Sequence, residues 1–192
     1  MKNFLLSIIF LIRACLVFSS KLPDVCPNII KKSEWGGRQA DKIAYTVIPL
    51  KYVIIHHTVT SKCMDPSSCS RTLANMQNYH MGTLKFDDIG YNFLIGGDGN
   101  VYEGAGWHRL GAHARGYNKI SIGVAFIGDF STEKPTPQQL EAGKKLIECG
   151  IALKDLDSSY KLLGAKSLRP TESPGAALFS EIQGWKGFTT KP

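Results

Sequence analysis

The amino-acid sequence predicts a single α/β domain built around one central sheet. Apolar runs of strand length alternate along the chain with longer segments whose apolar residues recur at helical spacing. Neither an internal repeat nor a low-complexity linker interrupts this alternation. Of the 192 residues, 43% are hydrophobic and 20% are charged, which is ordinary for a globular protein and excludes a disordered, collagenous or coiled-coil chain.

The first residues have the pattern of a secretory signal peptide. A lysine near the start precedes the largely apolar segment 4–12, and Val17 and Ser19 occupy the −3 and −1 positions for cleavage after residue 19. The uninterrupted apolar run is far shorter than the roughly 20 residues of a membrane-spanning helix. We therefore expect a signal peptide at 1–19 and a soluble, exported domain at 20–192.

An irregular arm and a buried strand come next. Residues 20–45 contain prolines and a glycine pair, which are typical of irregular structure. The run Tyr52-Val53-Ile54-Ile55 has no polar alternation, which predicts a strand buried on both faces. It ends in the His-His-Thr sequence at 56–58, at the kind of position where functional groups of α/β sheets emerge.

A helix is predicted from Pro66 to about Met81. Asp65 can cap it, and proline suits its first turn. The residues that we expect to share its inward face are Leu73, Met76 and Tyr79 with His80.

Two more strand regions follow this helix. A hairpin is predicted from strands at 91–95 and 101–103, because the intervening Gly-Gly-Asp-Gly-Asn sequence is a strong turn signal. A further apolar strand spans 120–127.

The C-terminal part predicts two helices around a short strand. The first helix begins at Thr136-Pro137, the strand lies at 162–164, and the last helix begins at Ser173-Pro174. The inward-facing residues are expected to be Leu140, Leu146, Ile147 and Ile151 in the first helix and Leu178, Ile182 and Trp185 in the last.

Four cysteines remain after signal removal, and an exported protein pairs them as disulfides. Cys26, Cys63, Cys69 and Cys149 allow three pairings. Cys63–Cys69 would close a tight loop, so we favour it, with Cys26–Cys149 as the second bridge. The alternative of thiolate zinc ligands is weaker, because the spacings match no zinc signature.

The five histidines, His56, His57, His80, His108 and His113, are gathered in one part of the chain. A histidine that ends a buried strand is often simply a satisfied core residue. That alternative weakens here because polar and aromatic residues stand at comparable loop positions, namely His80, Tyr91, Trp107, His113 and Asn118. No HExxH, GxSxG or phosphate-loop motif is present, so spacing predicts a pocket without assigning a reaction.

The charge narrows the class of partner. Loss of the signal peptide lowers the formal net charge from +7 to +5, and the basic residues are scattered. Nucleic acid is an unexpected partner for an exported protein, and no segment suits a membrane. Anionic polymers of a cell surface are the more natural partner.

A series of motifs in fixed order resembles one family. The motifs are SEWG at 33–36, VIIHHT at 53–58, DIGYNFLIG at 88–96, VYEGAGW at 101–107, GAHARGYN at 111–118, SIGVAFIGDF at 121–130 and RPTESPG at 169–175. They cover nearly all of residues 26–190 and resemble the short, secreted peptidoglycan recognition proteins of insects. The resemblance implies a fold related to zinc amidases, with a mixed sheet, three main helices and an L-shaped groove. It also implies the Cys63–Cys69 bridge, which is usual in that family.

Catalytic members of this family cut the bond between N-acetylmuramic acid and L-alanine. They hold zinc with two His and one Cys, and use a Tyr and a Thr or Lys near the metal. By resemblance, this sequence keeps His56, Tyr91 and Thr171 but has Ala165 and Ser173 at the other two ligand positions. Alanine has no donor atom and a serine hydroxyl replaces thiolate poorly, so we expect no catalytic residue, no bound metal and no cofactor.

The resemblance implies that the groove persists without the metal. The residues expected to bind peptidoglycan are His56, His57, Thr58, His80, Lys85, Phe86, Tyr91, Trp107, His113, Asn118 and Thr171. Members that prefer the diaminopimelate stem carry Gly-Trp where this chain has Lys85-Phe86, and an Arg where it has Ala105. We therefore expect the lysine-type stem.

The expected function is that of a secreted pattern-recognition receptor in innate immunity. It would bind bacterial peptidoglycan without cleaving it and, through partner proteins, trigger a Toll or prophenoloxidase cascade. Two alternatives stay open at this point, a zinc-dependent amidase and a directly bactericidal protein that binds the envelope.

Overall fold

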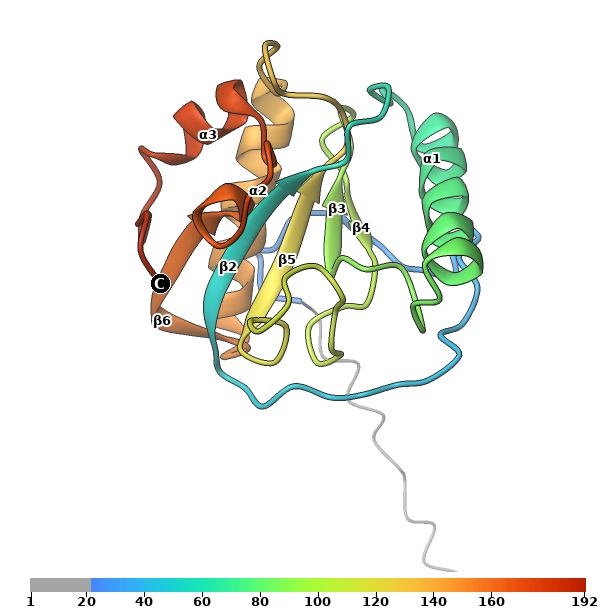
Figure 1. Ribbon diagram of the computed structural model, residues 1–192, viewed down its shortest axis with the longest axis horizontal. Coiled ribbons are helices and arrows are strands. Elements are labelled where there is room, and N and C mark those ends of the chain that lie inside the picture. The colour runs from blue at the N-terminus through green and yellow to red at the C-terminus, as the bar shows by residue number, and fades with distance from the viewer. Residues whose placement is uncertain (1–21) are drawn as a thin grey trace, which may run out of the picture.

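Six strands form one mixed sheet in the order β1-β4-β3-β5-β2-β6. The structure is a computed structural model that describes residues 22–192, and the signal peptide predicted at 1–19 lies outside them (Figure 1). β3 and β4 pair antiparallel, and the remaining neighbours run parallel. The strands are β1 (Ile29–Ile30), β2 (Leu50–His57), β3 (Phe93–Ile95), β4 (Val101–Glu103), β5 (Ser121–Phe126) and β6 (Leu156–Gly164). The prediction of one mixed central sheet is confirmed.

In the described residues, three α-helices flank the sheet: α1 (Pro66–Asn78), α2 (Pro137–Ala152) and α3 (Ala176–Ile182). α1 begins where predicted, because the Asp65 side chain accepts from the Ser68 amide at 3.0 Å. α2 begins with a capping box in which Thr136 and Gln139 bond each other's backbone amides. α3 begins two residues after the predicted Pro174, because its cap Gly175 has a φ of +86°.

The helices cover different faces of the sheet. α2 and α3 enclose the larger core, to which they contribute Leu146, Ile147, Leu178 and Ile182. α1 packs Cys69 and Leu73 against a second cluster on the other side. In Figure 1, α2 runs behind the strands while α1 stands apart at the side. The face of the sheet that carries α1 is therefore not covered by α2 and α3.

Three local predictions need correction. The arm at 20–45 is not wholly irregular, because Ile29–Ile30 form β1 beside β4; two residues are too few to give a sequence pattern. β6 is nine residues long rather than the three predicted at 162–164, because its polar first half has no apolar strand pattern. Tyr79 is 54% exposed because α1 gives way to a π-helical turn (η1, Tyr79–Thr83), which changes the periodicity of the helix face.

Both predicted disulfides are present. Cys26–Cys149 joins the arm to α2, and Cys63–Cys69 joins the loop before α1 to its first turn. Among residues 22–192, no helix has the length and apolar character needed to cross a membrane.

Candidate functional site

The two adjacent histidines at the end of β2 point to opposite faces of the sheet. Side chains alternate along a strand. His56 faces the α1 side, where its Nε2 lies 3.2 Å from Nδ1 of His113. His57 faces the other side, where its Nδ1 accepts from the Phe130 amide at 3.2 Å. His57 is therefore removed from the group of residues that we predicted to line one groove.

His56 is the centre of a cluster of rings drawn from four segments. The His56 ring centroid lies 5.3 Å from that of His113 and 5.2 Å from that of Tyr91. His80 of the π-helical turn lies 5.9 Å from Tyr91 and 5.6 Å from Phe86. The structure thus brings together five of the residues predicted to bind the ligand.

Burial keeps the two central histidines uncharged. Desolvation, together with His113 and then Arg169, lowers the pKa of His56 well below its ordinary value. Desolvation and then Arg169 lower the pKa of His113 to about 3. Burial raises the pKa of Tyr91, so its phenol stays protonated. At neutral pH these three side chains are neutral hydrogen-bonding groups, and the positive charge near them is that of Arg169.

The position of His113 depends on a glycine and an asparagine. A Cβ on Gly123 of β5 would lie 2.4 Å from Cγ of His113, so the strand leaves just enough room for the ring. The Asn118 side chain accepts from the amides of His113 (3.1 Å) and Ala114 (2.8 Å). Asn118 therefore shapes the loop that carries His113.

A cavity of about 490 Å³ opens beside this cluster, between α1 and the end of β2. Its polar wall consists of hydroxyl, amide and imidazole groups. The lining residues are Thr58, Thr60, Ser61, Thr72, Asn75, Met76, Tyr79, His80 and Tyr91. Such a surface suits a ligand rich in amides and hydroxyls.

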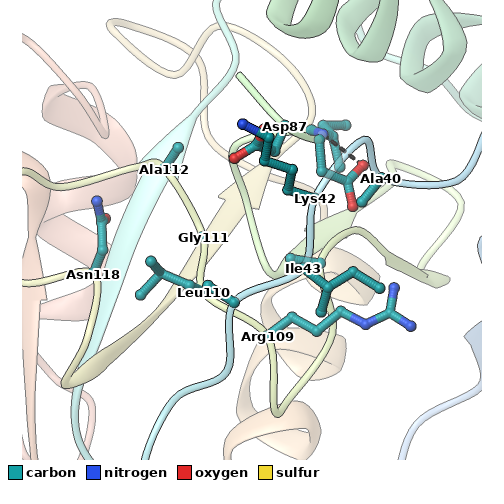
Figure 2. A pocket seen from close by; sticks show the side chains of 13 residues that line it. Ala40, Lys42, Ile43, Asp87, Arg109, Leu110, Gly111, Ala112 and Asn118 are labelled. Carbon is teal, nitrogen blue, oxygen red and sulfur yellow. Dashed lines mark hydrogen bonds between the residues drawn. The ribbon is translucent and has the colours of Figure 1, made fainter. Parts of the chain in front are cut away.

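A second, smaller pocket of about 220 Å³ has charged walls. Arm residues 40–44 form one side, and the 109–112 segment forms another; Figure 2 shows Asn118 on the side away from Lys42 and Asp87. Ala105 also lines this pocket, as do Arg109 and Asp88. The position predicted to discriminate stem peptides thus belongs to this pocket and not to the larger cavity.

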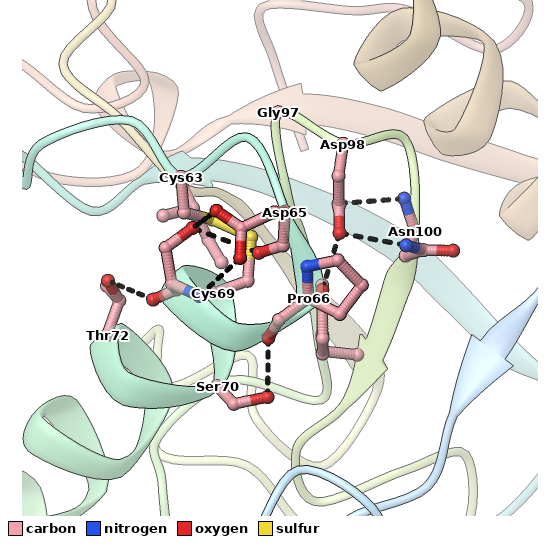
Figure 3. The surroundings of a disulfide bond; sticks show 12 residues. Cys63, Asp65, Pro66, Cys69, Ser70, Thr72, Gly97, Asp98 and Asn100 are labelled. Atoms are coloured by element: carbon pink, nitrogen blue, oxygen red, sulfur yellow. Dashed lines mark hydrogen bonds between the residues drawn. A yellow bond between two sulfur atoms is a disulfide. The ribbon is translucent and has the colours of Figure 1, made fainter.

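A short disulfide loop lies in the chain between two segments that line the larger cavity, 58–61 and 72–80. Figure 3 shows the Cys63–Cys69 bridge beside the Asp65 cap of α1. Upstream of it, the Thr58 hydroxyl accepts from the Gly128 amide at 3.0 Å and lies 2.8 Å from the Thr60 hydroxyl. These bonds hold two hydroxyls on the cavity wall.

Trp107 does not lie with the other predicted residues. Its ring packs against Phe93, at 4.6 Å between centroids, on the face covered by α2. A Cβ on Gly150 of α2 would lie 2.6 Å from the same ring. The glycine-rich loop folds Trp107 over the larger core, so the prediction that it lines the groove needs correction.

Two other predicted residues lie at the edge of the site. Lys85 is exposed and has a φ of +60°. Thr171 is half-buried, and its hydroxyl accepts from the Ser173 amide at 3.3 Å.

Sequence reasoning missed several lining residues. Thr72, Asn75, Met76 and Tyr79 recur at i, i+3, i+4 and i+7, which is one helix face. That periodicity could have identified them, but we expected two of them, Met76 and Tyr79, to pack inward. Arg169 carried no such signal, because its effect on His56 and His113 arises from the fold.

The residues beside His56 do not fit a zinc ion. Ala165, which follows β6 next to β2, has no donor atom, and the Ser173 hydroxyl already accepts from the His57 amide at 3.1 Å. The Nε2 atom of His56 is itself engaged with His113. Across the described chain, no three His, Cys, Asp or Glu side chains gather as a metal site.

Comparison with known proteins agrees with this geometry. Residues 46–176 match the family described as N-acetylmuramoyl-L-alanine amidase. Peptidoglycan-recognition protein 2 of Holotrichia diomphalia is 56% identical over 192 residues, covering 100% of both chains. Peptidoglycan-recognition protein SA of Drosophila melanogaster is 46% identical over 170 residues, which is 88% of this chain and 84% of the relative.

Solved structures agree as well. Bumblebee PGRP-SA superposes with a TM-score of 0.85 and 47% identity, covering 87% of this chain and 100% of that one. A complex of the PGRP-LCa and PGRP-LCx ectodomains bound to tracheal cytotoxin gives a TM-score of 0.84 and 44% identity, covering 85% and 99%. The chain belongs to the N-acetylmuramoyl-L-alanine amidase family and, within it, to the insect peptidoglycan-recognition proteins.

Proposed function

We propose that this protein is a secreted receptor that binds bacterial peptidoglycan without cleaving it. The observation that carries the proposal is the surroundings of His56. A ring cluster and a cavity of about 490 Å³ are in place, while Ala165 and Ser173 stand where zinc ligands are expected by resemblance. One histidine cannot by itself hold a catalytic zinc, which needs three protein ligands. Binding is therefore retained and hydrolysis is lost.

The chemistry of the groove supports a muropeptide as ligand. Amide and lactyl groups need both donors and acceptors, which Thr58, His80 and Tyr91 supply in uncharged form on the cavity wall. Related structures hold tracheal cytotoxin, including PGRP-LE, where it is described as a monomeric diaminopimelic acid-type peptidoglycan. A ligand of this class fits the uncharged, hydroxyl-lined cavity.

The stem preference that we propose is the lysine type. Position 105, where a fixed guanidinium would pair with the extra carboxylate of diaminopimelate, is the buried Ala105. Lys42 and Arg109 line the same pocket as Ala105. If the protein preferred the diaminopimelate stem, these two cations would be the groups to pair with its extra carboxylate. Comparison of the two stems therefore tests this part of the proposal separately from binding itself.

The place of action that we propose is extracellular fluid, with signalling through an immune proteolytic cascade of the Toll or prophenoloxidase type. The signal-peptide pattern at 1–19 and two disulfides support secretion. The cascade is the part of the proposal that depends on partner proteins, which recognise the receptor once it is bound to polymeric peptidoglycan.

A sedimentation assay tests the proposal. Purified mature protein is mixed with insoluble lysine-type peptidoglycan at physiological salt, and the pellet and the released products are measured. We expect the protein in the pellet and no new N-terminal alanine. Absence of binding would refute the receptor, and zinc-dependent release of peptide would show an amidase. Bacterial killing by the protein alone would point instead to a bactericidal role.

A further inference from the structure

A buried lysine of the N-terminal arm is bonded to the loop that carries the predicted stem-discriminating residues. Lys32 is only 7% exposed, and its ammonium donates to Oδ2 of Asp88, whose side chain is 11% exposed. Asp88 closes the segment 84–88, in which Lys85 and Phe86 lie. Since 56 positions separate the two residues, this ion pair links distant parts of the chain.

The other carboxylate oxygen of Asp88 is bonded as well. Oδ1 accepts from the Gln77 side chain at 2.9 Å and from the Ile89 amide at 2.7 Å. Gln77, on α1, also exchanges two hydrogen bonds of 2.9 Å with the backbone of Arg38 in the arm. Asp88 is therefore the point where the arm, α1 and this loop are joined.

The arm that supplies Lys32 is itself firmly packed. The Lys32 amide donates to the Glu103 carboxylate at 3.1 Å, and the Trp35 indole donates to the Glu103 carbonyl at 2.8 Å. A Cβ on Gly37 would lie 2.4 Å from the Trp35 ring and 2.6 Å from Cγ of Lys32. The aliphatic part of the Lys32 side chain is therefore held against Gly37 of the arm, and its ammonium reaches Asp88 from a fixed position.

We propose that Lys32 is a positioning residue for stem recognition. Acting through Asp88, it holds the 84–88 loop in the conformation that presents Lys85 and Phe86 to the stem peptide. This inference rests on the proposed function, and it assigns to the arm a role in ligand selection. The loop has another tie to the arm, from the Asp41 amide to the Asp87 carbonyl at 2.8 Å, but that bond fixes no side chain.

The physical reason is the cost of an unpaired buried charge. Removal of Lys32 leaves the Asp88 carboxylate buried with neutral donors alone, and a carboxylate in that state moves toward water or is protonated. Either response changes how Asp88 anchors the loop. Asp88 lies three residues after Lys85 and two after Phe86, so the position of both residues is affected. Removal of both charges relieves the penalty but does not restore the link.

Three variants separate positioning from stability. They are Lys32→Met, Lys32→Met combined with Asp88→Asn, and the control Lys134→Met, which breaks the exposed Lys134–Glu181 pair. Calorimetry measures the Kd of each for a muramyl tripeptide ending in L-lysine and for its meso-diaminopimelate counterpart. Thermal unfolding is recorded in parallel.

We expect the wild type and Lys134→Met to bind the lysine tripeptide about tenfold more tightly than the other. In Lys32→Met, we expect a lower Tm, and we expect the Kd values for the two tripeptides to differ by less than about threefold. In the double variant, we expect most of the Tm to return while the ratio stays low, a split that a merely structural role would not produce.

Three results would overturn the inference. They are an unchanged ratio in Lys32→Met, recovery of the ratio together with Tm in the double variant, and a wild type that binds both tripeptides equally. A wild type that binds neither would refute the proposed function itself.

Discussion

His56 and His113 form a neutral pair at the floor of the site. Their rings are buried, their nearest nitrogens are 3.2 Å apart, and Nε2 of His113 has no hydrogen-bond partner among residues 22–192. An unpartnered buried nitrogen is costly unless a ligand or water bonds it. Because this nitrogen is enclosed by protein, the surrounding side chains would have to move before a ligand could bond it.

Gly123→Ala tests the space that His113 occupies. The added Cβ would lie 2.4 Å from the His113 ring, so the ring or β5 must move, at a cost of about 1–3 kcal/mol. We expect weaker peptidoglycan binding together with a lower free energy of unfolding. Gly82→Ala is the matched control, since its Cβ would meet nothing within 4 Å. Equal binding by both variants would contradict the assigned role of His113.

The burial of His80 should make the free energy of unfolding depend on pH. Burial lowers its pKa, and its Nδ1 accepts from the Gly90 amide at 3.0 Å, which requires the neutral ring. As pH falls through about 6.5, the unfolded chain takes up the proton first, so the free energy of unfolding decreases until the folded-state pKa is reached. Urea unfolding at pH 7.5 and 5.5 should show a smaller decrease for His80→Gln than for the wild type. Identical decreases would show that His80 is not perturbed.

At the scale of residues, the sequence identifies candidate site residues better than it identifies which way their side chains point. His56 and Tyr91 could be found from motifs, and His80 from its place in the histidine-rich part of the chain. We predicted that both His56 and His57 line the groove, but alternation along β2 sends adjacent side chains to opposite faces of the sheet. Trp107 could not be placed, because the loop that carries it has no periodicity and its direction is set by packing against Phe93.

At the scale of elements, the two disulfides hold different parts of the molecule. Cys26–Cys149 spans 123 positions and anchors the arm, whereas Cys63–Cys69 spans six and shapes the rim of the cavity. The bridge that closes the longer loop restricts the unfolded chain more.

The two bridges should therefore behave differently when removed. Paired Cys→Ser replacement at Cys26 and Cys149 should lower the free energy of unfolding by about 2–5 kcal/mol with little effect on ligand affinity. The same replacement at Cys63 and Cys69 should cost less stability but weaken binding, because the Thr58–Thr60 wall loosens. Urea titration and calorimetry check the two expectations. The opposite pattern would contradict this division of roles.

Helices with clear capping residues could be predicted from the sequence. Strand segments that depend on pairing with a neighbouring strand could not. α1 and α2 begin at their predicted caps, Asp65 and Thr136. β1 is defined only by its register with β4, and the polar residues 157–160 of β6 lie at a register shift against β2, so neither segment has a sequence pattern of its own.

At the scale of the whole molecule, a chain of an amidase family has no group of three potential zinc ligands among residues 22–192. If Ala165 and Ser173 are the reason, then Ala165→His combined with Ser173→Cys should create a three-ligand site with His56. We expect stoichiometric zinc in the purified double variant, measured by elemental analysis, and none in the wild type. The single variants serve as controls. Zinc in the wild type would contradict the assignment.

The most direct test of the central claim is calorimetry of the mature protein with a lysine-type muropeptide, with and without added zinc, followed by analysis of the recovered ligand. We predict saturable binding that zinc does not change, with the ligand recovered intact. Cleavage that appears only with zinc would show that the protein is an enzyme and that His56 has metal-binding partners other than Ala165 and Ser173.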